Sequence, residues 1–103
     1  MNRKPRLMMT LMVSVLLISA TAAHALGDRE AGREKARACA GCHGMDGNGR
    51  IPLAGKSVSY LEGQLRAYQS GVRRSQMMNT IAKQLDDQDI ADLAAYFAAM
   101  NPQ

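Results

Sequence analysis

The sequence predicts a small all-α domain with three to five short helices. Apolar side chains recur at helical spacing in two segments, residues 61–68 and residues 90–97. Capping residues precede both segments, and no segment shows the alternation of apolar and polar residues that is typical of a strand. A hydrophobic share of 47% and a charged share of 21% exclude a disordered tail.

Residues 1–25 have the features of a cleaved secretory signal peptide. A basic stretch over residues 2–6 precedes an apolar run over residues 7–18, and Ala23-His24-Ala25 is an A-x-A cleavage signal. The apolar run is shorter than the about 20 residues that cross a bilayer. We therefore predict cleavage after Ala25, export to the periplasm and no membrane span afterwards. The alternative is an uncleaved N-terminal anchor.

Residues 26–103 form the predicted domain, which begins with a helix from about Arg29 to Ala38. Asp28 can cap this helix. A loop follows, because Asp46-Gly47-Asn48-Gly49 is a run of residues that favour turns.

The second predicted helix begins at a capping box, Ser59-Tyr60-Leu61-Glu62. Leu65 and Tyr68 continue the apolar face that Leu61 begins, and Gly71 is the predicted end. Gly63 costs this helix about 1 kcal/mol relative to alanine, and we expect it to allow close packing.

A short third helix is predicted over residues 79–84, before the last helix. Asp86 caps the last helix, with Asp89 in the capping-box position. Asp87, Asp89 and Asp92 place negative charge in its early turns, near the positive end of the helix dipole. Its predicted buried stripe is Ile90, Leu93, Ala94 and Phe97, and Asn101-Pro102 ends it.

The predicted domain has too little material for a self-sufficient core. Fewer than 80 residues rarely build one unaided, and this domain contains four aromatic residues and no tryptophan. We therefore expect a bound group to complete the core. Three of the 13 basic residues lie in the signal, so the domain carries ten basic and nine acidic residues. This near neutrality excludes a basic surface for nucleic acid.

The strongest signal in the sequence is the C-x-x-C-H motif Cys39-Ala40-Gly41-Cys42-His43. Two thiols at this spacing reach the two vinyl groups on one porphyrin edge and form thioethers, and the adjacent imidazole binds the iron. We predict one covalently attached haem c, with Cys39 and Cys42 as attachment sites and His43 as the proximal iron ligand.

Three other interpretations of the two cysteines are weaker. A thioredoxin-like pair expects a βαβ pattern, which is not visible. A structural zinc site needs four nitrogen or sulfur ligands, and the domain offers only Cys39, Cys42 and His43. A plain disulfide suits an oxidising compartment but leaves the small core unexplained.

The second axial ligand of the haem iron cannot be a histidine of the same domain, since His43 is the only one after residue 25. Met77 and Met78 lie 34 and 35 residues beyond His43, far enough for the chain to wrap the haem. One of these two is the predicted ligand. The weaker candidates are Met45, Met100, Lys35, Lys56 and Lys83.

Several motifs together resemble the class I c-type cytochromes, which are single-haem electron carriers. They span residues 28–99 and comprise the haem motif with Gly44, Asp46-Gly47-Asn48, Leu53-Ala54-Gly55, Tyr60-Leu61 with Gln64-Leu65, Ser70-Gly71-Val72-Arg73 and residues 89–97. The chain is most similar to the short single-haem members and to one half of the related two-haem carriers. The resemblance implies the class I cytochrome c fold, with short helices wrapped around the haem.

The resemblance also assigns roles to individual residues. It places the axial methionine shortly before the acidic cap of the last helix, which favours Met78 and keeps Met77 in reserve. It implies that the first and last helices meet at Gly32, against Tyr96 or Phe97. It also implies that Arg73 pairs with a haem propionate or an acidic partner. Arg74, which has no such family match, is expected to be a solvated charge.

One detail departs from the family pattern. A proline carbonyl of the family typically accepts the hydrogen bond of the haem histidine. Here Pro52 directly precedes Leu53-Ala54-Gly55, where relatives often have one more residue in between, so the acceptor is either Pro52 or Ile51.

The implied function is electron transfer between redox proteins in the periplasm, through small and transient contacts, without substrate turnover. Thioether ligation by methionine closes the iron site and raises the reduction potential. Two alternatives remain. In the first, the chain is not a free monomer but a cytochrome subunit of a periplasmic dehydrogenase, for example one that oxidises a sulfur compound. In the second, the methionine ligand is missing from the iron or labile, and the open haem serves as a gas sensor or a peroxidase.

Overall fold

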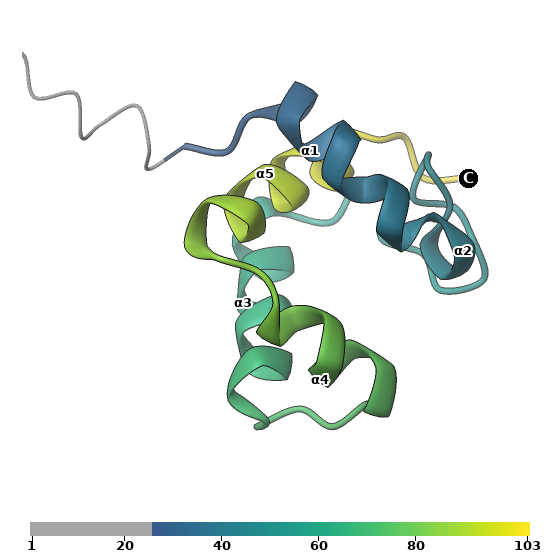
Figure 1. The fold of residues 1–103 in the computed structure, drawn as a ribbon. Coiled ribbons are helices and arrows are strands. Elements are labelled where there is room, and N and C mark those ends of the chain that lie inside the picture. The colour runs from purple at the N-terminus through teal and green to yellow at the C-terminus, as the bar shows by residue number, and fades with distance from the viewer. Residues whose placement is uncertain (1–25) are drawn as a thin grey trace, which may run out of the picture.

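The structure is a computed structural model that describes residues 26–103 (Figure 1). It contains helices α1 (Arg29–Lys35), α2 (Ala40–His43), α3 (Val58–Ser70), α4 (Gln76–Lys83) and α5 (Asp87–Ala98), and the 3-10 helix η2 (Ala36–Cys39). Over this range there is no strand, so the predicted all-α class is confirmed. No helix within it is long and apolar enough to cross a membrane. The predicted signal peptide lies outside the described residues.

Helices α1 and α5 pack almost backbone to backbone at Gly32, which is buried. A Cβ atom at Gly32 would lie 2.1 Å from the Asp92 carbonyl oxygen and 2.8 Å from the Tyr96 Cβ atom. The predicted meeting of Gly32 with the last helix is therefore confirmed, and Tyr96 is the aromatic partner. Helix α5 also packs on α3, and α4 packs on the other end of α3, as Figure 1 shows.

The first helix is shorter than predicted, and α3 has a different cap. Helix α1 ends at Lys35, after which the chain tightens into η2. The predicted capping box at Ser59 is wrong, because Ser59 already lies within α3. Ser57 has an extended backbone instead, and its hydroxyl accepts the Tyr60 amide at 3.1 Å. The end of α3 at Gly71 is confirmed, with a φ of +81°.

Helix α4 begins at Gln76, three residues before the predicted start, whereas α5 begins as predicted. Ser75 caps α4 by accepting the Met78 amide at 3.3 Å. Asp86 and Asp89 form the predicted reciprocal capping box of α5.

The core lies where α5 meets α1 and α3. Its buried cluster comprises Ala36, Leu61, Leu93, Ala94, Tyr96 and Phe97. The predicted stripe of α5 is buried throughout. Gly63, in contrast, has no atom within 4 Å of an added Cβ, so the expected close packing at this position is wrong.

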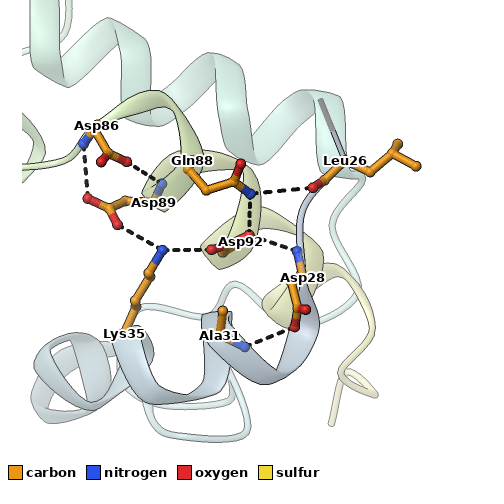
Figure 2. A network of polar contacts seen from close by, with 8 residues as sticks. All are labelled: Leu26, Asp28, Ala31, Lys35, Asp86, Gln88, Asp89 and Asp92. Carbon is orange, nitrogen blue, oxygen red and sulfur yellow. Dashed lines mark hydrogen bonds and ion pairs between the residues drawn. The ribbon is translucent and has the colours of Figure 1, made fainter. Parts of the chain in front are cut away.

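A polar network ties the start of the domain to α5 (Figure 2). The Asp92 carboxylate is only 2% exposed and accepts hydrogen bonds from the Asp28 amide at 2.7 Å, the Lys35 ammonium at 2.6 Å and the Gln88 amide group at 2.7 Å. Lys35 also forms an ion pair with Asp89 at 2.8 Å. Asp92 is thus a buried anchor rather than a solvated charge of an early helical turn.

The network holds its groups in their charged forms. Burial alone would raise the pKa of Asp92, but the hydrogen bonds from the Asp28 amide, Lys35 and Gln88 outweigh it and leave the pKa below its ordinary value. Hydrogen bonds from Lys35 and the Asp86 amide lower the pKa of Asp89. The two aspartates in turn raise the pKa of Lys35.

Two glycine substitutions test the α1–α5 contact. We expect Gly32→Ala to reduce the free energy of unfolding by about 1–3 kcal/mol, because the new methyl group overlaps the backbone of α5. Gly63→Ala, in open space on α3, should raise it by about 0.5–1 kcal/mol. Urea unfolding of the haem-loaded variants, followed by circular dichroism, measures both. Equal effects of the two substitutions would contradict the close approach at Gly32.

A substitution of Asp92 tests the network. We expect Asp92→Asn to lower the free energy of unfolding by about 2–3 kcal/mol near neutral pH, because an amide faces the Lys35 ammonium. Since the folded-state pKa of Asp92 is depressed, its contribution is complete above the ordinary pKa of 3.8 and disappears as the pH falls through the folded value. Urea unfolding across this pH range should therefore show the wild type and the variant converging in acid. A constant difference would mean that the Asp92 charge contributes nothing.

Candidate haem site

The C-x-x-C-H residues lie on two consecutive short helices beside an apolar cavity. Cys39 ends η2, and Cys42 and His43 lie on α2. Cys39 and His43 line the cavity, and Cys42 is half-buried. The two cysteines are not joined in a disulfide, and burial raises the pKa of the Cys39 thiol. The Cys39 thiol and the His43 imidazole are therefore presented to the cavity, and Cys42 lies next to His43 on α2.

His43 is oriented by a backbone carbonyl. Its ring is buried, and Nδ1 lies 2.7 Å from the Ile51 carbonyl oxygen. Because a carbonyl only accepts, Nδ1 carries the proton and Nε2 keeps its lone pair for a metal. Of the two predicted acceptors, the structure therefore selects Ile51 rather than Pro52. The Ile51 amide donates to the Cys42 carbonyl at 3.1 Å, and this bond holds the loop at Ile51 against α2. The next residue, Pro52, lines the cavity.

Helices α3 and α5 supply most of the other walls of this cavity. Its apolar lining comes from Leu61, Leu65, Leu93, Ala94 and Phe97, with Leu53 from the loop before α3. The polar lining residues include Lys56 and Arg73, and no aspartate or glutamate is among the described residues that line it. An apolar cavity lined by one thiol of the C-x-x-C pair, an imidazole and cationic side chains fits a haem with its iron and its propionates.

The two candidate methionines are in different environments. Met78 is half-buried and lines the cavity together with His43. Met77 is 61% exposed and lies on a separate surface with Gln76, Thr80 and Ile81. Met45 and Met100 pack against the core and are not among the lining residues. Among the methionines of residues 26–103, Met78 alone lines the cavity.

The three lysines named as weaker ligand candidates also lie in different environments. Lys35 is held by Asp89 and Asp92, so it is available neither to the cavity nor as a free docking charge. Lys56 lines the cavity, and its ammonium lies 5.6 Å from the centre of the Tyr60 ring. Lys83 lies on another part of the surface, together with Arg74.

Arg73 lies at the cavity, in contact with two residues of α3. Its guanidinium lies 4.8 Å from the centre of the Tyr68 ring and donates to the side-chain oxygen of Gln64. All three residues line the cavity. Arg74, one residue further along, does not.

Sequence reasoning missed two supporting residues, Ser75 and Asn79. Ser75 precedes a segment of helix-forming residues, so its role as a cap was detectable. The partners of Asn79 are the backbone groups of Tyr68, Arg73 and Ser75, and which of them it reaches depends on the path of the loop between α3 and α4, for which a single sequence contains no signal.

Short helices surround an apolar cavity with the C-x-x-C-H motif at its edge. This fold and this site together are those of the c-type cytochromes. Residues 30–101 match the sequence profile of the Cytochrome c family. The chain belongs to this family and, as its single C-x-x-C pair indicates, binds one haem c covalently. Its function is accordingly electron transfer by a haem protein.

Individual relatives agree with this assignment. Cytochrome c-554(548) of Halomonas halodenitrificans is 42% identical over 80 residues, which are 71% of this chain and 96% of the relative. The structure of reduced cytochrome c4 from Pseudomonas stutzeri matches with a TM-score of 0.70 and 36% identity, over 75% of this chain and 47% of that one. The chain thus spans about half the length of this cytochrome c4, as predicted.

A thiosulfate dehydrogenase structure from Marichromatium purpuratum contains a similar domain. The match has a TM-score of 0.69 and 35% identity, and it covers 73% of this chain but only 19% of that one. The same fold therefore also occurs within an enzyme.

Proposed function

We propose that the protein is an exported electron carrier whose haem iron is bound by His43 and Met78. It accepts single electrons from one redox protein in the periplasm and passes them to another, and it does not itself turn over a substrate. Residues 1–25 would be removed after export, following Ala25.

The observation that carries this proposal is the placement of Met78 in the same cavity as His43, with Met77 directed elsewhere. The cavity therefore offers one imidazole nitrogen and one thioether sulfur from segments 35 residues apart. When bound, the haem supplies a one-electron couple, and a sulfur ligand favours its ferrous state.

The chain's own residues would keep that couple in a constant environment. The Ile51 carbonyl fixes the ring and the tautomer of His43. Leu61, Leu93 and Phe97 are almost completely buried, and they exclude water from the cavity wall. A site closed by two ligands and packed in this way changes its oxidation state with little movement of the protein.

Exchange with partners would occur where the lining of the cavity reaches the surface. Ile51 is 53% exposed and Tyr60 is 46% exposed, although both line the cavity. Small, short-lived contacts suit such a rim. The near-neutral charge of residues 26–103 argues against strong long-range steering, so Lys56 and Arg73 would act at short range.

A second candidate function is that of a cytochrome subunit of a periplasmic dehydrogenase. The similar domain in the thiosulfate dehydrogenase structure favours it. In that case the protein should co-purify from its native source with a larger chain that contains flavin or molybdenum. A free carrier should elute alone, at the mass of a small haem protein.

Optical spectra distinguish the closed carrier from an open haem site. We expect the oxidised protein to show the weak sulfur-to-iron charge-transfer band, and the reduced protein not to bind carbon monoxide. A high-spin spectrum with ready carbon monoxide binding would contradict the carrier and point to a sensor or a peroxidase.

Substitution of the two neighbouring methionines tests the ligand. We expect Met78→Ala to abolish the charge-transfer band, to allow carbon monoxide to bind and to lower the reduction potential, because sulfur ligation is lost. Met77→Ala, at the exposed neighbouring position, is the matched control and should leave all three properties unchanged. The opposite pattern would make Met77 the ligand.

A further inference from the structure

We infer that Asn79 is a positioning residue for Met78, and this inference rests on the proposed ligation by Met78. The evidence is a set of hydrogen bonds that converge on the Asn79 side chain. Its amide nitrogen donates to the Tyr68 carbonyl at 2.7 Å and to the Arg73 carbonyl at 2.8 Å. Its oxygen accepts the Ser75 amide at 2.8 Å.

These bonds join three segments whose residues line the same cavity as Met78. Tyr68 lies in the last turn of α3, Arg73 in the loop between α3 and α4, and Ser75 at the cap of α4. The hydroxyl of Ser75 in turn accepts the Met78 amide at 3.3 Å. The Ser75 hydroxyl therefore holds the Met78 backbone directly, and the Asn79 side chain holds Ser75 and ties this turn to α3 and the loop.

The chemistry of the three partners requires a carboxamide. Two of them are carbonyl oxygens, which need donors, and the third is an N–H group, which needs an acceptor. A carboxylate at this position would keep the acceptor and place negative charge against two carbonyl oxygens. A methyl group would remove the side-chain partner of the Arg73 carbonyl and of the Ser75 amide, and would leave the Tyr68 carbonyl with only the Gly71 amide at 3.3 Å.

The loop itself has few other restraints toward α4. Val72, Arg73 and Arg74 are exposed, and Gly71 has left-handed backbone geometry. Arg73 stays tied to α3, because its amide donates to the Ala67 carbonyl at 3.0 Å and its guanidinium to Gln64. Without the Asn79 bonds, however, the first turn of α4 can separate from α3 and from the loop. The Met78 side chain would then leave the cavity more easily.

Gln69 offers a matched control within the same helix pair. Its side-chain amide also donates to two backbone carbonyls, those of Ala82 at 3.2 Å and Leu85 at 2.8 Å. These contacts tie α3 to the far end of α4, away from Met78. Loss of either side chain should therefore weaken the packing of α3 on α4, but only loss of Asn79 should release the methionine.

The experiment measures how readily imidazole displaces Met78 from the oxidised haem protein. We expect Asn79→Ala to lower the dissociation constant for imidazole about tenfold, which corresponds to about 1.4 kcal/mol. Asn79→Asp, which has the same shape, should change it in the same direction and serves if the alanine variant does not fold. Gln69→Ala should change it less than twofold, although its free energy of unfolding also falls.

The outcomes separate this inference from the proposed ligation. Equal imidazole affinities in the Asn79 and Gln69 variants would overturn the positioning role. If Met78→Ala nevertheless loses the charge-transfer band, the ligation by Met78 stands without a positioning role for Asn79. If Met78→Ala keeps that band, the ligand assignment fails and the role of Asn79 fails with it.

Discussion

The near-contact of α1 with α5 at Gly32 is the constraint on which the rest of the domain depends. It fixes α1, from which η2 and α2 continue, against α5, and so brings Cys39 and His43 to the cavity that α5 also lines. The carboxylate of Asp92 fixes the same crossing by binding the Asp28 amide and Lys35. In this small domain with few aromatic side chains, close backbone packing and a buried charge thus hold α1 and α5 together. Apolar side chains are then available to line the haem cavity.

The two sides of the cavity are built in different ways. On the side of His43, backbone groups provide the restraint: the Gly49 amide donates to the His43 carbonyl at 2.8 Å, and the Ile51 carbonyl accepts from the ring. On the side of Met78, side chains provide it, through Ser75 and Asn79. A backbone restraint depends on the path of the loop and tolerates many side chains, whereas a side-chain restraint depends on single residues.

Much of the fold and of the haem site was predictable from the sequence, and the predictions that were wrong failed for physical reasons. The C-x-x-C-H motif, the Asp86 cap and the buried stripe of α5 are local patterns, so the sequence displays them directly. The start of α3 was misplaced because Ser57 and Ser59 both qualify as caps and only the backbone geometry decides. The burial of Asp92 could not be predicted, since acidic residues in an early helical turn are ordinarily solvated. Its partners Asp28 and Lys35 lie more than 50 residues away in sequence.

The choice between adjacent methionines shows why residue spacing alone was insufficient. Met77 and Met78 are equally far from His43 for a flexible chain, and both lie in the first turn of α4. They differ by about 100° around the helix axis, the rotation that one residue produces at 3.6 residues per turn. Ser75 determines where α4 begins, and the bonds of Asn79 fix how its first turn lies against α3. These two polar residues therefore decide which sulfur lines the cavity.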